Sequence, residues 1–359
     1  MTVVGAILLA AGLGAAVSQA LGSALSDRFG RRPILVVAAS LSVLLYAGLA
    51  LSIGMSAPVW TIALVYIISR SALTIIRPVI SAMVADLTAR EKLTEAYGIL
   101  RTGANIGWAA GPAIGGFLIA FLTWGWLFAI AALICGIVAL IVFLRVRESP
   151  HEVSTTVSFR SIFPAGNNPP FLAFLVLGLL LFVVAGQMGS TLSIFTVRMV
   201  GLSPTQYGLL LTLNGLLVVF FQYLTTLSLR RVAKFRALVL GSLLYGLGYL
   251  SLGWITTFGW AMGAMAVVTM GEMIVSPVML SVVGELSPAD QRGRYMGQFG
   301  LGQTVGTALG PLVGGVLLDV FPSDARFVWG PVALIAVITA VGYYYWARRF
   351  VLRAPQRTA

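Results

Sequence analysis

Glu272 is the residue whose place in the sequence points most directly to chemistry. It is a carboxylic acid in the middle of the apolar run 267–277. An ionised carboxylate inside a bilayer costs on the order of several kcal/mol, so the protonated form is favoured there until water or a cation reaches the group. Such a residue can bind a proton and, once deprotonated, a cationic substrate. The alternative is a neutral, hydrogen-bonded acid that serves packing alone.

Six further polar residues lie within long apolar stretches and could line a cavity. Intramembrane arginines usually face a partner or water, whereas amide side chains can also form ordinary hydrogen bonds between helices. The candidates are Arg70, Arg77, Arg101, Asn105, Gln187 and Asn214. Arg101 lies near the end of its stretch, where its charged group can reach the membrane surface. These stretches contain three arginines and one acid, so an anionic substrate is also possible. Arg70 and Arg77 would then be its counter-charges.

Histidine and cysteine are too scarce for a metal centre or for His-based catalysis. The chain has one histidine, His151, and one cysteine, Cys135, which lies in an apolar stretch where a small packing residue fits. We therefore expect a protein that is not an enzyme and that holds no metal and no cofactor. Because Glu272 can bind and release a proton, a proton gradient is the source of energy that we expect this protein to use.

The elements that carry these residues are expected to be membrane helices. Hydrophobic residues make up 59% of the chain and charged residues 9%, a composition suited to a bilayer. Eleven continuous apolar stretches each have about the 20 residues that cross a hydrocarbon core as a helix. They lie at 3–25, 34–54, 58–85, 96–121, 124–145, 170–196, 205–228, 237–256, 259–284, 295–319 and 327–347. The predicted fold class is an all-α membrane protein.

Basic residues are concentrated in alternate connections between these stretches. Of the 23 Lys and Arg residues, 18 fall in one set of connections, and the opposite set holds Arg198 and Arg326. The basic connections are 26–33, 86–95, 145–169, 229–236, 285–294 and the tail from residue 348. By the positive-inside rule, these loops and the C-terminus face the cytoplasm in a multi-pass protein of the cytoplasmic membrane. The net charge of +12 therefore requires no nucleic-acid partner.

A glycine-rich string occurs twice, 199 residues apart. The first copy is Gly98, Gly107, Gly111, Pro112, Gly115 and Gly116, and the second is Gly297, Gly306, Gly310, Pro311, Gly314 and Gly315. The match runs without a gap from 78–118 to 277–317, with 13 identities in 41 positions. Glycines four apart let a neighbouring helix approach closely, and the proline bends the helix. Two related halves are typical of secondary transporters.

The connection 23–33 carries a recognisable pattern. Asp27, Arg28, Gly30, Arg31 and Arg32 match the signature loop Gly-x-x-x-Asp-Arg/Lys-x-Gly-Arg/Lys-Arg/Lys, with Ser23 in place of its leading glycine. In this loop the chain resembles the major facilitator superfamily. The glycine strings are similar to the antiporter motif of that family, Gly-x8-Gly-x3-Gly-Pro-x2-Gly-Gly, which marks exporters more often than importers. The chain around Glu272, Gly-Glu-Met-x-x-x-Pro, resembles a helix of proton-coupled drug and peptide carriers.

The resemblance implies a cytoplasmic gate. Asp27 would lie at the start of the helix that follows Arg294, where the positive end of the helix favours an anion. Displacing Asp27 would then open the gate. The corresponding loop of the second half, 227–236, keeps its basic residues but has Leu229 in place of the acid, so this contact is expected in the first half alone.

The resemblance also implies a fold of two pseudo-symmetric helical bundles. Family members have twelve membrane spans, and their signature loop follows the second span. This sequence shows eleven spans, and the loop follows the first span. The opening helix is therefore expected to be missing. The predicted organisation is an N-terminal bundle, a cytoplasmic linker, a C-terminal bundle and a cytoplasmic tail. Their bounds are 1–145, 146–169, 170–347 and 348–359.

The function that follows is transport by alternating access. We expect a monomer in the lipid bilayer that exports amphipathic small molecules, drugs among them, in exchange for protons. A proton-linked carrier of organic anions or other solutes is the alternative within the same class. A membrane scaffold or receptor that keeps the fold without transporting is the alternative from a different class.

Overall fold

The computed structural model of the chain describes residues 1–89, 93–149, 168–288 and 292–350, and this part is helical without β-strands. It divides into two compact units. The N-terminal unit is Ile7–Ser158, and the C-terminal unit is Met1–Ala6 with Phe159–Ala359. The division falls inside the linker expected at 146–169, of which residues 150–167 lie outside the described part.

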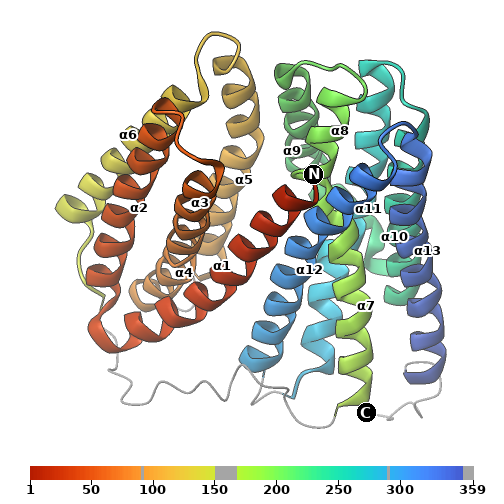
Figure 1. Cartoon of the computed structure of the whole chain (residues 1–359). Coiled ribbons are helices and arrows are strands. Elements are labelled where there is room, and N and C mark those ends of the chain that lie inside the picture. The colour runs from red at the N-terminus through yellow and green to blue at the C-terminus, as the bar shows by residue number, and fades with distance from the viewer. Residues whose placement is uncertain (90–92, 150–167, 289–291, 351–359) are drawn as a thin grey trace. The chain divides into compact units, whose positions relative to one another are not determined.

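The helices follow the order of the apolar stretches (Figure 1). The first six are α1 (Thr2–Phe29), α2 (Arg31–Gly54), α3 (Val59–Thr74), α4 (Ile76–Leu87), α5 (Leu93–Leu118) and α6 (Trp124–Arg145). The remaining α-helices are α7 (Pro169–Ala185), α8 (Thr191–Arg198), α9 (Pro204–Ser228), α10 (Lys234–Ser251), α11 (Phe258–Leu286), α12 (Arg292–Val320) and α13 (Ala325–Phe350). Short 3-10 turns are η3 (Gly186–Met188), η4 (Leu229–Arg231) and η5 (Leu252–Trp254).

Ten helical segments of the described chain are long and apolar enough to cross a membrane. They correspond to ten of the eleven stretches expected from the sequence. The stretch expected at 96–121 is helical as α5 but is not among the ten. Its glycines, together with Arg101 and Asn105, make α5 less apolar than its neighbours.

Two of the expected spans are interrupted. The stretch 58–85 is divided into α3 and α4, because Pro78 in the first turn of α4 has no N–H to donate to the carbonyl of Thr74. The stretch 170–196 is divided into α7, η3 and α8. The hydroxyl of Tyr207 donates to the carbonyls of Met188 and Gly189 at this second break, at 3.0 and 3.1 Å.

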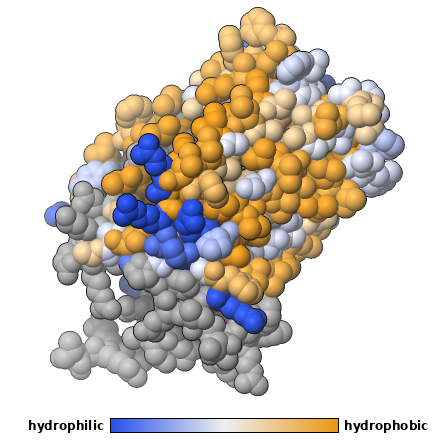
Figure 2. All heavy atoms as spheres, turned by 90° about the vertical axis from the view of Figure 1, so that its left-hand side faces the viewer, coloured by the Kyte–Doolittle hydropathy of each residue, from blue (hydrophilic) through white to orange (hydrophobic). Residues whose placement is uncertain are grey.

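The N-terminal unit has a small core. Its α2 packs along α6 and against α3 and α4, and the cluster of fully buried apolar residues comprises Leu35, Val79, Met83 and Val142. Figure 2 shows a broad apolar surface, with hydrophilic residues gathered near one end. On α6 large apolar side chains are exposed over successive turns, among them Leu133, Ile137, Leu140 and Leu144. A helix that is apolar on every side suits contact with lipid.

The C-terminal unit has an extensive aromatic core. Its α10 packs between α11 and α13, and α12 packs along α7. The rings of Tyr245 and Tyr249 are stacked, and Tyr249 stacks in turn on Trp329, with centroids 6.3 and 5.4 Å apart. Phe174 packs against Tyr343 with ring centroids 5.6 Å apart. These contacts fix the relative positions of α7, α10 and α13.

The second glycine string lies in the contact between α12 and α7. A Cβ added to Gly306 would lie 2.6 Å from the Cβ of Phe182, and one added to Gly310 would lie 2.8 Å from the Cα of Gly186. Real Cβ atoms do not approach other atoms so closely, so only glycine permits this packing.

Within the described part of its own unit, the first glycine string makes no such contact. A Cβ added to Gly107, Gly111 or Gly115 of α5 would meet no atom within 4 Å, and the same holds for Gly103 one turn earlier. The sequence predicted close helix packing for both copies, and for these glycines of the first copy it stays a prediction. The string sets the spacing of the small residues, but a neighbouring helix has to supply the contact.

Candidate functional site

Glu272 takes part in a polar cluster between α9 and α11. The amide Nδ2 of Asn214 donates to Glu272 Oε2 at 2.8 Å and to Thr269 Oγ1 at 3.0 Å. Thr269 Oγ1 donates in turn to the carbonyl of Met265 at 2.8 Å. Asn214 and Thr269 are fully buried, and Glu272 is partly exposed. The carboxyl group is thus held by a neutral donor and remains within reach of solvent or of a bound molecule.

Helical spacing explains how the cluster is assembled. Thr269 and Glu272 are three residues apart in α11, so their side chains lie on one face. Asn214 reaches that face from α9, which packs against α11. The sequence identified Glu272 and Asn214 separately, and the structure brings them together. Thr269 was missed, although its spacing from Glu272 could have revealed it.

Two tyrosines extend the cluster toward the aromatic core. Tyr245 and Tyr249 of α10 both interact electrostatically with Glu272. Both are buried, and in the described part of the chain the hydroxyl of Tyr249 and the indole N–H of Trp329 have no hydrogen-bond partner. The rings of Tyr245, Tyr249 and Trp329 stack on one another and are buried, so they form core packing next to the carboxyl group.

Gln187 lies at the break between α7 and α8 instead of beside Glu272. It is fully buried, and its Nε2 donates to the carbonyls of Val183 and Gly310, at 3.1 and 2.9 Å. These bonds join the backbones of α7 and α12. The sequence left open whether Gln187 lines a cavity or bonds neighbouring helices, and the observed geometry is that of a bond between helices.

The other candidate residues belong to the N-terminal unit. Arg70 on α3 and Arg77 on α4 are exposed, and Asn105 on α5 is partly exposed. The side chain of Arg101 lies outside the described residues. Arg70 interacts electrostatically with Tyr46 of α2. These residues are not gathered into one cluster by any described contact.

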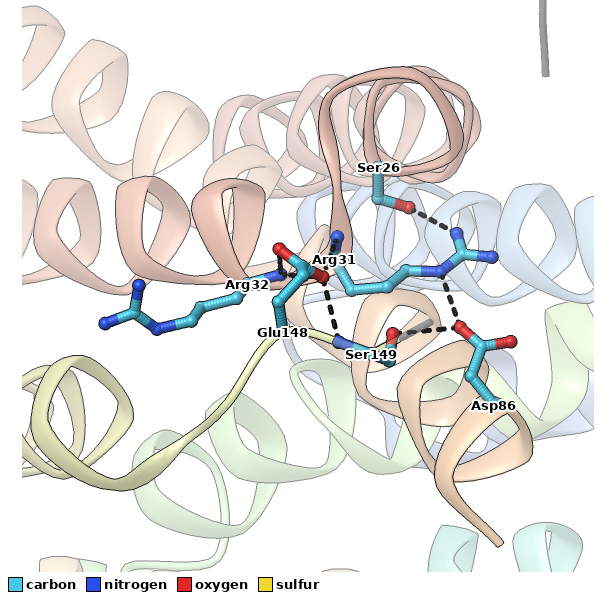
Figure 3. A network of polar contacts seen from close by, with 6 residues as sticks. All are labelled: Ser26, Arg31, Arg32, Asp86, Glu148 and Ser149. Atoms are coloured by element: carbon cyan, nitrogen blue, oxygen red, sulfur yellow. Dashed lines mark hydrogen bonds and ion pairs between the residues drawn. The ribbon is translucent and has the colours of Figure 1, made fainter. Parts of the chain in front are cut away.

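The loop predicted to form the cytoplasmic gate is held by two acids (Figure 3). Glu148 accepts hydrogen bonds from the backbone N–H groups of Arg31 and Arg32, at 2.9 and 3.2 Å. Arg31 Nε donates to Asp86 Oδ2 at 3.2 Å, and its Nη1 donates to Ser26 Oγ at 2.9 Å. The network connects the α1–α2 loop to the ends of α4 and α6.

Gly30 makes this turn possible. Its φ of 100° lies in the region that favours glycine, and an added Cβ would come within 2.8 Å of Glu148 Oε2. Glu148 then lies over the first N–H groups of α2, where the positive end of a helix favours an anion. Ser149 completes the network, since its Oγ donates to Asp86 Oδ2 at 3.0 Å.

Arg32 and Arg28 point to other partners. Arg32 Nη2 donates to the carbonyl of Phe143 at 2.8 Å. The guanidinium of Arg28 lies 5.2 Å from the ring centre of Phe29. The side chain of Asp27 lies outside the described residues, so its expected contact with the helix after Arg294 stays a prediction.

Sequence reasoning missed Asp86 and Glu148, although the repeat contains a signal for the first. Asp86 and Glu285 occupy the same position in the two halves, 199 residues apart. In the C-terminal unit Glu285 forms an ion pair with Lys234, which also donates to Ser281 Oγ at 2.7 Å. Each unit therefore pairs a basic residue of its loop with an acid near the C-terminal end of a helix, α4 in one unit and α11 in the other.

The chain belongs to the Major Facilitator Superfamily, whose profile matches residues 1–304 and, in a second alignment, residues 200–358. It is 27% identical to the MFS-type transporter YttB of Bacillus subtilis over 230 residues, 63% of this chain and 57% of YttB, so this match spans less than two thirds of that relative. It is 26% identical over 297 residues to the tetracycline resistance protein, class C, of Escherichia coli, 81% of this chain and 74% of that protein.

A solved structure shows the same fold. The crystal structure of a POT family transporter in complex with 5-aminolevulinic acid matches with a TM-score of 0.79 at 16% identity, over 97% of this chain and 88% of that chain. The expected all-α membrane fold is thereby confirmed. The chain is a multi-pass membrane protein of a transporter family and not an enzyme.

Proposed function

We propose that this transporter exports amphipathic cationic molecules in exchange for protons, with Glu272 as the residue that binds the proton. The observation that carries the proposal is the contact of a partly exposed Glu272 with Asn214 inside an apolar helix. The similarity to a tetracycline resistance protein supports export of drug-like molecules.

The hydrogen bond from Asn214 is compatible with both forms of the carboxyl group. The amide can donate to Oε2 when the other oxygen is protonated and when the group is ionised. In the protonated form the site is neutral and can reorient within the membrane. In the ionised form it attracts a cation, because an unpaired carboxylate inside a membrane is costly. One residue can thus bind proton and substrate in turn.

The loop 26–33 is proposed as part of the cytoplasmic gate. The network of Arg31, Asp86 and Glu148 joins the ends of three helices, so the loop moves together with α4 and α6. The positive-inside rule places this loop and the C-terminal tail in the cytoplasm. The residues proposed to form the gate contact are Asp27, Arg28, Gly30, Arg31 and Arg32.

Proteoliposomes that contain the purified protein provide the test. A proton gradient should drive efflux of a cationic dye, and Glu272→Gln should abolish the gradient-dependent part while leaving the protein folded. Glu285→Gln is a matched control, because it removes the same charge from the same helix away from the cluster. Dye efflux that persists unchanged in Glu272→Gln would contradict the proposal.

The same assay separates the alternatives. Gradient-driven movement of an organic anion that is lost in Arg70→Gln or Arg77→Gln would favour an anion carrier. Absence of any gradient-driven flux across drugs, sugars and organic acids would favour a scaffold or receptor that keeps the fold.

A further inference from the structure

α11 contains a break in its backbone hydrogen bonding directly after Glu272. Pro277 lies inside this helix, and proline has no backbone N–H, so the carbonyl of Met273 loses the donor that a regular helix provides. Hydrocarbon offers no replacement donor, so such a carbonyl needs a partner from the protein.

Gln222 of α9 is that partner. Its Nε2 donates to the carbonyl of Met273 at 3.0 Å and to Thr226 Oγ1 at 3.2 Å. Met273 is buried and Gln222 is partly buried, so the bond is shielded from water. Because the donor comes from another helix, the bond ties the break in α11 to α9.

Asn214 also joins α9 to α11, through residues of α11 that precede Met273. It lies on α9, like Gln222, and donates to Thr269 and Glu272. Thr269, Glu272 and Met273 follow one another at the i, i+3 and i+4 positions of α11 and share a face. α9 therefore holds both the side chain of Glu272 and the backbone carbonyl of the next residue.

We propose that Gln222 is a positioning residue for Glu272. By completing the hydrogen bonding that Pro277 interrupts, it keeps the backbone at Met273 in register and the carboxyl group within reach of Asn214. The inference rests on the proposed role of Glu272 in proton binding. Gln222 itself needs no contact with the proton or the substrate, since its effect passes through the backbone of α11.

The pairing of Gln222 with Pro277 makes a specific prediction possible. Gln222→Met keeps the length of the side chain and removes its donor. Pro277→Ala restores an N–H that can reach the Met273 carbonyl from within α11, so that Gln222 is no longer required. Pro331, inside α13, provides a matched control in Pro331→Ala, because that substitution also removes an in-helix proline but leaves Met273 unchanged.

The experiment measures two quantities for each single and double variant. One is the apparent Tm of the purified protein in detergent. The other is the coupling ratio, defined as dye efflux driven by a proton gradient divided by dye exchange without a gradient. A purely structural role would lower Tm and leave this ratio unchanged.

In the native background, Gln222→Met should lower Tm by about 2–4 °C and the coupling ratio by roughly fivefold, the factor expected for one lost hydrogen bond. In the Pro277→Ala background both effects should largely disappear. In the Pro331→Ala background both should persist in full. Equal effects of Gln222→Met in all three backgrounds would overturn the proposal.

Failure of the proposed function gives a different pattern. If Glu272→Gln left the coupling ratio unchanged, the proton-binding role would be wrong. The Tm values would still report whether Gln222 and Pro277 act through the same carbonyl. A lower Tm with an unchanged ratio in Gln222→Met would overturn the positioning role and keep the hydrogen bond as a structural contact.

Discussion

Helices α5 and α12 carry the same spacing of glycines but differ in their neighbours within their own units. On α12 the glycines lie against α7 and η3, so closely that a single methyl group at Gly306 or Gly310 would overlap with its neighbours. On α5 a Cβ added at the matching positions, Gly107 and Gly111, would meet no atom of the described N-terminal unit within 4 Å. A motif of small residues makes close packing possible, but the stabilising energy comes from the helix that lies against it.

The two basic loops differ in the same way. In the N-terminal unit the Arg31 and Asp86 side chains are 12% and 21% exposed, and Ser26, Glu148 and Ser149 surround them. In the C-terminal unit the paired Lys234 and Glu285 side chains are 40% and 62% exposed. Charges shielded from water interact more strongly than exposed ones. The first loop is therefore the more firmly held of the two.

Alanine substitutions in the two glycine strings should change the free energy of unfolding most. Gly310→Ala should lower the free energy of unfolding by about 1–3 kcal/mol, because the new methyl group overlaps with the backbone of α7 and η3. Gly111→Ala should instead raise it by about 0.5–1 kcal/mol, because alanine loses less backbone entropy in a helix. Unfolding by denaturing detergent in mixed micelles measures both.

The test lies in the opposite signs of the two changes in unfolding free energy, a decrease for Gly310→Ala and an increase for Gly111→Ala. If both alanines destabilised the protein alike, α5 would have a close neighbour and the contrast with α12 would be wrong. Gly263→Ala in α11 is a further control, since this glycine also has open space around it and alanine should be tolerated.

The next effect separates the two ion pairs. Arg31→Met should lower the free energy of unfolding by about 1–2 kcal/mol, since it removes hydrogen bonds to Asp86 and Ser26 in a partly buried network. Lys234→Met should lower it by no more than about 1 kcal/mol, because its ion pair with Glu285 is exposed. The same unfolding measurement applies, and equal losses would show that enclosure of the first network contributes nothing.

The smallest effect concerns Glu148. Glu148→Gln should lower the free energy of unfolding by about 0.5–1 kcal/mol, because it removes the negative charge that faces the first N–H groups of α2. Unfolding at low and high salt provides the check. Salt screens exposed charges, so the loss should shrink as ionic strength rises. A loss that is independent of salt would assign the effect to hydrogen-bond geometry and not to charge.

Much of this protein could be read from its sequence, for reasons that are local. Ten apolar stretches correspond to long helical segments because backbone groups in a membrane must be paired within their own segment. Glu272 could be identified because a carboxyl group in an apolar run is costly and therefore rarely accidental. The signature loop could be recognised because Gly30 and its basic neighbours are adjacent in the chain.

Tertiary structure decided which of these features act together. Glu272 and Asn214 are 58 residues apart in the chain, and they meet only because α9 and α11 pack side by side. Arg31 meets Asp86 for a similar reason, whereas Gln187 is used to join α7 to α12. The sequence determined the helices, the repeat and the candidate acid, since these depend on hydropathy and spacing along one helix. Partners and burial depend on which faces of different helices meet, and that information became available only with the folded chain.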